Sequence, residues 1–102
     1  MSKYIVEYSR DSRQDLIDIK RYIKYNLYEP DIANKLIAKI RNGINKLIDN
    51  PEIYPIKDDE FLKKLEIRKL IIDNYIIFYR IKSYNIEIVR IMYCKRNWME
   101  LI

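Results

Sequence analysis

The chain of 102 residues contains no histidine. This absence excludes nucleophilic catalysis by Ser-His or Cys-His pairs and ribonuclease chemistry based on histidine, and it removes most zinc sites. The only glycine, Gly43, falls within a helical pattern, which excludes a glycine-rich phosphate loop and a dinucleotide fingerprint. The lone Cys94 cannot form an internal disulfide, so we expect a reducing compartment, the cytoplasm.

Long apolar runs are missing as well. No stretch is long enough to cross a bilayer, and the N-terminus lacks a signal-peptide pattern, so we expect no contact with membranes. The densest acidic run is Asp58, Asp59 and Glu60. These carboxylates are adjacent on an expected loop, where a solvated charge run is the ordinary explanation. The sequence therefore predicts neither a metal site nor a cofactor.

The composition is that of one globular domain covering residues 1–102. The chain is 49% hydrophobic and 34% charged, with a net charge of +5, which is typical of a folded rather than a disordered chain. The positive charge favours an anionic partner, either nucleic acid or an acidic protein. Abundant Ile, Lys, Asn and Tyr resemble an A·T-rich coding bias, which raises the lysine content without a functional reason.

Hydrophobic periodicity predicts an α+β fold in the order β-α-α-β-β-β. We expect a helical hairpin packed on one face of an antiparallel sheet, with the place of the first strand in that sheet left open. Ser9 or Ser12 is expected to cap the first helix, and Ser12 with Asp15 fits a capping box. A loop is expected over residues 50–64 and a short helical turn over residues 97–102. The expected strands are residues 3–8, 65–72, 75–82 and 86–93, and the expected helices are residues 11–27 and 31–48.

Both faces of the predicted sheet are rich in apolar residues. Strict alternation puts Ile76, Phe78 and Arg80 on one face of the middle strand, and Arg90 with Met92 on one face of the last strand. A sheet with one wet face alternates more sharply than this. Since the helical hairpin covers only one face, we expect a partner protein on the other. The alternative is that the chain's own linker and tail cover it.

A basic and aromatic cluster ends the last predicted strand. Arg96, Lys95 and Arg80 are candidates for holding a phosphate, and Tyr93 or Lys95 for proton transfer, if the chain cuts RNA. Such proton transfer requires a strongly shifted pKa. Trp98 is a candidate for stacking on a base or for packing the tail down.

Short motifs are spread over nearly the whole chain. They consist of Asp15, Leu16, Ile19, Leu47, Asn50, Pro51, Tyr54, Pro55, Arg68, Leu70, Asp73, Asn74, Tyr75, Phe78, Tyr79, Ile88, Arg90, Ile91, Met92, Tyr93 and Arg96. The order and spacing of these residues resemble the RelE/ParE toxin superfamily. The resemblance implies a small toxin of a bacterial type II toxin–antitoxin module, inactive while an antitoxin wraps its surface. It implies that partner contacts involve Arg68, Lys69, Ile76, Phe78, Arg90 and Trp98.

The resemblance leaves the target open. ParE-like members inhibit DNA gyrase, and RelE-like members cut mRNA on the ribosome. The nucleases commonly carry an arginine where this chain has Ile76, and many carry histidine where it has Tyr93, whereas Arg96 and Lys69 match their basic residues. The helical hairpin and the Asn-Pro linker look more like the ParE branch. We therefore expect a gyrase inhibitor, with the ribosome-dependent nuclease and a non-toxic antitoxin-binding homologue as alternatives. A homodimer is expected to form when antitoxin is absent.

Overall fold

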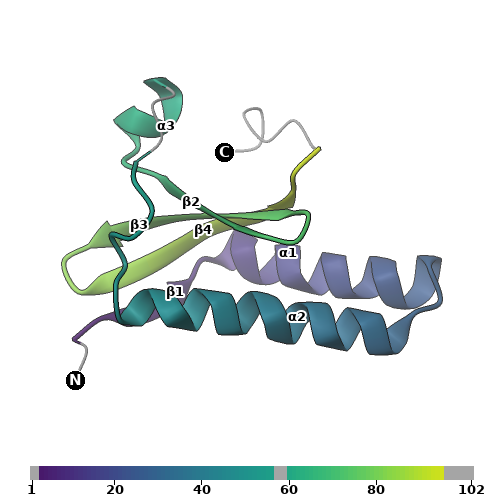
Figure 1. Cartoon of the computed structure of the whole chain (residues 1–102). Coiled ribbons are helices and arrows are strands. Elements are labelled where there is room, and N and C mark those ends of the chain that lie inside the picture. The colour runs from purple at the N-terminus through teal and green to yellow at the C-terminus, as the bar shows by residue number, and fades with distance from the viewer. Residues whose placement is uncertain (1–2, 57–59, 96–102) are drawn as a thin grey trace.

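A mixed four-stranded sheet lies between a helical hairpin and a short third helix (Figure 1). The computed structural model describes residues 3–56 and 60–95. Within them, no helix is long and apolar enough to cross a membrane. The elements are β1 (Ile5–Tyr8), α1 (Arg10–Arg21), the π-helix η1 (Tyr22–Asn26), α2 (Pro30–Asn45), the 3-10 helix η2 (Lys46–Ile48), α3 (Glu60–Lys64), β2 (Arg68–Ile72), β3 (Tyr75–Lys82) and β4 (Asn85–Tyr93).

The sheet has the strand order β1-β4-β3-β2. The meander β2-β3-β4 is antiparallel as predicted, and its turns place Asp73 at φ 52 and Ser83 at φ 54. The expectation of a fully antiparallel sheet is wrong at one edge, because β1 pairs with β4 in parallel. A parallel pair requires a long crossover, and here the hairpin and the meander together supply it.

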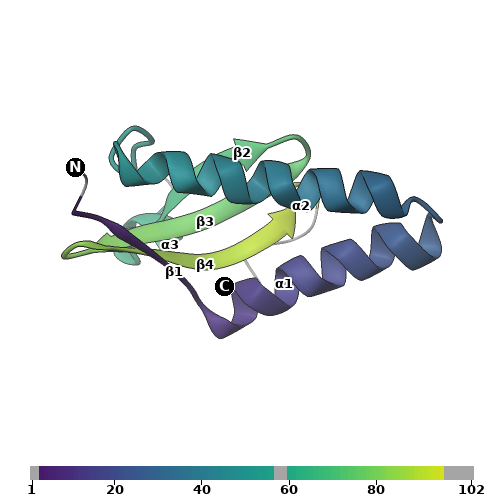
Figure 2. The ribbon, with the colours of Figure 1, turned by 90° about the horizontal axis from the view of Figure 1, so that it is seen from below.

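The main core lies between the sheet and the helical hairpin (Figure 2). Leu16 of α1, Ile40 and Ile44 of α2, and Ile77 and Tyr79 of β3 are buried there. The apolar stripes of both helices are therefore satisfied by one face of the sheet, as their spacing predicts. Gly43 allows this close packing, because a Cβ on it would collide with the side chain of Ile72 in β2.

A β-bulge in β4 changes which residues face the hairpin. Tyr79 pairs with Ile88, whereas Phe78 pairs with Arg90, so β4 carries one extra residue. Ile91 consequently joins the main core, and Val89 packs with Met92 on the opposite face. The predicted strict alternation is wrong beyond Ile88, because a bulge shifts every later side chain to the other face.

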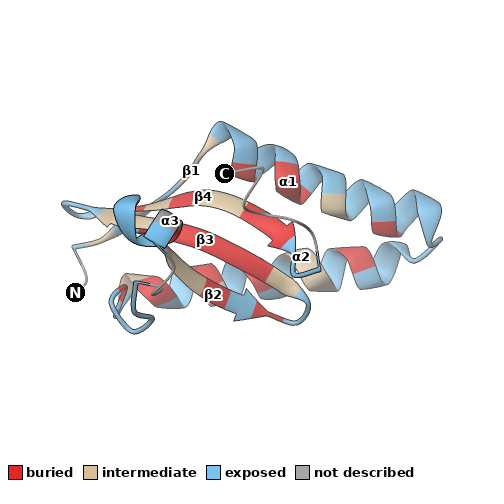
Figure 3. Cartoon of the chain, turned by 90° about the horizontal axis from the view of Figure 1, so that it is seen from above, coloured by how far each residue is buried: buried red, intermediate tan, exposed pale blue. Residues whose placement is uncertain are grey.

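The second face carries its own small core. Leu62 of α3 packs with Ile67, Ile76, Phe78 and Met92, all at most 4% exposed. The expectation of a face left open for a partner is wrong for these residues, and the alternative is correct for Leu62, which comes from the linker. Figure 3 shows the resulting buried band along β3. The predicted loop over residues 50–64 is thus partly helical, whereas the turn expected at residues 97–102 lies outside the described part of the chain.

Candidate functional site

The N-terminal part of α1 completes the edge of β4 where β1 ends. Ser9 N donates to Ile88 O at 3.0 Å, and Ser9 Oγ donates to Val89 O at 2.8 Å. The same Ser9 Oγ caps α1 by accepting from Ser12 N at 3.0 Å. One turn later, Asp15 Oδ2 accepts from Ile91 N at 2.9 Å. Asp15 therefore acts as an edge partner of β4, and the capping box predicted for it with Ser12 is not formed.

Asp15 also holds the side chain of Arg90. Nε and Nη2 of Arg90 donate to the two carboxylate oxygens, each at 2.8 Å, and the side chains of Arg90 and Asp15 are 17% and 10% exposed. The hydrogen bonding that Arg90 donates to the Asp15 carboxylate raises the pKa of Arg90, so the guanidinium remains charged. This bidentate pair fixes α1 against the bulge of β4 and uses the arginine that the sequence offered for partner binding.

A groove of about 750 Å³ opens beside this pair, between the far end of the helical hairpin and the ends of β3 and β4. Its rim includes Tyr22 (55% exposed), Leu27 (50%) and Ile32 (53%), while Asp18 and Glu29 contribute carboxylates. Tyr22 belongs to the π-helix η1, a local irregularity that is frequent at functional sites. The remaining lining residues are Asp15, Ile19, Ile23, Tyr75, Ile91, Met92 and Tyr93.

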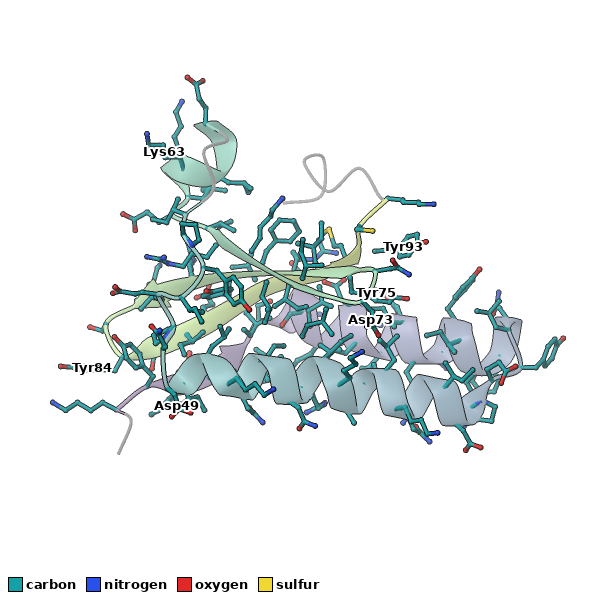
Figure 4. All side chains as sticks on the ribbon, viewed as in Figure 1. Asp49, Lys63, Asp73, Tyr75, Tyr84 and Tyr93 are labelled. Carbon is teal, nitrogen blue, oxygen red and sulfur yellow. The ribbon has the colours of Figure 1, made fainter. Side chains whose placement is uncertain are left out.

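Two tyrosines close the sheet end of the groove. The rings of Tyr75 and Tyr93 are 5.7 Å apart at a tilt of 59° (Figure 4). Burial raises the pKa of Tyr75, and neighbouring Tyr93 and Tyr22 raise it further, so its hydroxyl stays protonated at neutral pH. An apolar wall with phenol hydroxyls and carboxylates at its rim is suited to binding an amphipathic protein segment. The described residues contain no cluster of His, Cys, Asp or Glu able to hold a metal.

The candidate nuclease residues do not come together within the described chain. Tyr93 is 42% exposed at the end of β4, and Lys95 lies in the exposed turn that follows. Arg80 pairs instead with Glu87 across the opposite end of the β3–β4 ladder, at 2.9 Å. Arg80 is five positions along β3 from Tyr75, the partner of Tyr93, which is about 17 Å along the strand. Arg96, the fourth candidate, lies outside the described residues.

The candidate binding residues are also dispersed. Arg68 is half-buried and its Nη1 donates to Tyr54 O at 2.6 Å. Lys69 is half-buried on the second face. Ile76 and Phe78 are 4% and 0% exposed, so a partner reaches them only if covering residues move. Trp98, like Arg96, lies outside the described residues.

Sequence reasoning missed the groove residues Tyr22, Glu29 and Ile32. A signal was present, because Tyr22 and Ile32 are large apolar side chains adjacent to the apolar stripes of their helices rather than within them. Only the packing angle of the hairpin on the sheet shows that these side chains face one opening.

The helical hairpin on one face of a mixed sheet defines a class of small α+β proteins that includes a solved structure. "Chromosomal ParDE TA system from P. aeruginosa" is such a structure, with a TM-score of 0.75 and 20% identity. The match covers 91% of this chain and 98% of that chain. At this low sequence identity, the match shows that the two chains share a fold. No curated protein sequence matches the chain.

The family model of the "ParE toxin of type II toxin-antitoxin system, parDE" matches residues 6–98. The chain therefore belongs to the ParE toxin family, whose members are toxins of type II toxin–antitoxin systems. The prediction of a RelE/ParE superfamily member from its short motifs is confirmed.

Proposed function

We propose that this chain is a growth-arresting toxin of the cytoplasm that inhibits DNA gyrase and does not cut RNA. The separation of the candidate nuclease residues carries this proposal. Arg80 is bound to Glu87 and lies about 17 Å along the sheet from Tyr93 and Lys95. A single phosphate contacts only groups within hydrogen-bond reach, so these side chains do not form one phosphate site. Membership in the ParE family supports gyrase as the target.

The groove beside α1 and η1 is the surface that we assign to the antitoxin. Its exposed rim offers apolar anchors in Tyr22 of η1, Leu27 of the connection and Ile32 of α2. An amphipathic segment buries such anchors, and the carboxylates of Asp18 and Glu29 favour lysine or arginine on that segment. Occupation of this groove would neutralise the toxin by covering the hairpin and the sheet end together.

Parallel measurements of DNA and protein synthesis test the target. After a brief induction without antitoxin, DNA synthesis is expected to fall first while mRNA remains intact, and the purified protein is expected to inhibit supercoiling by gyrase. Arg80→Ala and Lys95→Ala are expected to stay toxic, because the proposed activity does not use a phosphate site that includes these two side chains.

Two other outcomes would contradict the proposal. If the wild-type chain causes cleavage of mRNA within codons and both variants lose toxicity, the chain would be assigned to the ribosome-dependent nucleases. Normal growth on induction of the soluble, folded wild-type chain would favour the antitoxin-binding homologue without toxicity.

A matched pair of isoleucine variants tests the antitoxin groove. Ile32 is 53% exposed and lines the groove, whereas Ile17 is 48% exposed on α1 and does not line it. Ile32→Glu is expected to weaken antitoxin binding by at least about tenfold, as for an interface anchor. Ile17→Glu makes the same change in charge at similar exposure and is expected to bind normally. Equal affinities of the two variants, measured by calorimetry with the antitoxin of the same operon, would place the antitoxin elsewhere.

A further inference from the structure

The outer edge of β2 forms a second surface, on the opposite side of the sheet from β1. β2 is the last strand in the order β1-β4-β3-β2. Ile56 forms an isolated antiparallel bridge with Arg68, so the chain itself already places a strand-like residue against the start of this edge. Beyond that bridge, no strand among the described residues lies beside Leu70, Ile71 or Ile72 on this side. An uncovered edge of this kind is a template for a further strand.

A row of lysines on α2 and at the start of η2 runs beside this edge. Lys35, Lys39, Asn42 and Lys46 are spaced by four, three and four residues, which places them on one helical face. All four are exposed, and with Leu70, Ile71 and Ile72 they line a groove of about 680 Å³. This groove shares no lining residue with the one assigned to the antitoxin.

The positive charge of the lysine row is only partly neutralised by ion pairs among the described residues. Lys39 Nζ lies 2.7 Å from Asp73 Oδ1, with side chains 61% and 44% exposed, and Asp73 stands beside α2 in Figure 4. A pair this exposed contributes little and exchanges readily. Within the described part of the chain, Lys35 and Lys46 have no ion pair. The groove therefore has positive charge on its α2 side and no bound carboxylate at two of its three lysines.

The other face of the same edge carries the apolar side chain of Ile71 beside that of Lys69, which pairs with Phe78. Ile71 pairs with Ile76, which places its side chain on the face away from the hairpin, and it is 60% exposed. A strand added to β2 would present alternate side chains to these two environments. Side chains on the helix side would meet the lysines, and those on the far side would lie beside Ile71.

We propose that the edge of β2 binds an extended segment of another protein in which acidic and apolar residues alternate. The backbone edge supplies hydrogen bonds, the lysine row selects acidic side chains, and Ile71 selects apolar ones. Nucleic acid satisfies the lysines but cannot continue the hydrogen-bond ladder of β2. The inference goes beyond the proposed function, since neither gyrase inhibition nor the antitoxin groove is needed for it.

Binding of a synthetic peptide to the whole protein tests this surface. The probe is a fluorescent eight-residue peptide that alternates valine and glutamate, measured by anisotropy. Its analogues are the same peptide N-methylated at every residue and a peptide with lysine in place of glutamate. We expect the first peptide to bind and both analogues to bind at least tenfold more weakly. Amide hydrogen exchange at residues 70–72 is expected to slow on binding of the first peptide.

Variants of the lysine row separate it from the general positive charge. Lys35→Glu with Lys46→Glu is expected to weaken binding roughly tenfold. Lys20→Glu with Lys24→Glu changes the net charge equally on the other arm of the hairpin and is expected to leave binding unchanged. These exposed substitutions leave the core intact, which circular dichroism verifies.

Each contrary result overturns the proposal. Failure of the first peptide to bind, or equal binding of its N-methylated analogue, would show that the edge of β2 does not accept a strand. Equal weakening in the two double variants would reduce the effect to net charge. A single-stranded oligonucleotide that binds more tightly than the peptide and depends on Lys35 and Lys46 would assign the row to nucleic acid.

Discussion

Replacing Asp15 by alanine removes one carboxylate that serves two parts of β4. The substitution deletes the acceptor for Ile91 N at 2.9 Å and both acceptors for Arg90 at 2.8 Å. Arg90 keeps its charge in a position where its side chain is 17% exposed. Breaking a buried pair by removing one partner costs about 3–5 kcal/mol. The remaining exposure of Arg90 places the expected loss near the lower value, about 3 kcal/mol.

This loss is large against the whole stability of a domain, which is about 5–15 kcal/mol. The assay is urea denaturation followed by far-UV circular dichroism, with the wild-type slope as a check on two-state behaviour. Asp15→Asn separates the contributions, because its amide oxygen can still accept from Ile91 N while the charge opposite Arg90 is lost. We expect it to lie between wild type and Asp15→Ala.

The double variant Asp15→Leu with Arg90→Met removes both charges at once. Because no charge is then left buried without its counterion, we expect it to be more stable than Asp15→Ala with Arg90 retained. A loss below about 1 kcal/mol in Asp15→Ala would refute the reasoning, since that is the contribution of an ordinary exposed pair. Additive effects of the two single changes in a double-mutant cycle would refute it as well.

Two further predictions concern the main core. Burial raises the pKa of Tyr79 to about 12. The protonated hydroxyl therefore stabilises the folded state fully below the unfolded pKa near 10, and this contribution of up to about 3 kcal/mol is lost as pH rises from about 10 to about 12. Tyr79→Phe should lack this part of the pH dependence of unfolding in urea titrations, and parallel curves for the two proteins would contradict the prediction. Gly43→Ala should lower the free energy of unfolding by about 1 kcal/mol, because crowding against Ile72 exceeds the gain in helix propensity. In the Ile72→Val background the same change should raise it, and an equal loss in both backgrounds would contradict the contact.

The elements whose signal is local were predictable from the sequence. The stripes on both helices, the break between the two expected helices and the short connections between the last three expected strands depend on neighbours within a few residues. The parallel pairing of β1 with β4 was not predictable, because it joins residues about 80 positions apart, such as Val6 and Ile86. Sequence periodicity indicates local secondary structure and does not show which distant strands pair.

The candidate site was predicted less well than the fold. Arg90 is where a partner-binding cation was expected, but its Nε and Nη2 donate to Asp15. The pairing of Arg90 with Asp15 depends on the bulge in β4 and on the end of β1 at Tyr8. Neither feature can be recognised from the amino-acid composition. Charge also misled at Arg80, because its partner Glu87 is adjacent only across the β3–β4 ladder. Sequence spacing thus identified reactive residue types but not their counterions.

The pairing of the first strand with the last has a consequence for synthesis of the protein. β1 gains its neighbour, and Asp15 gains Arg90 and Ile91, only after residues 85–91 have been translated. Contacts of such long sequence separation also slow folding, because a long loop must close first. A nascent chain cut short before β4 therefore lacks both the closed sheet and the fixed hairpin. This topology therefore delays the mature fold until β4 has left the ribosome.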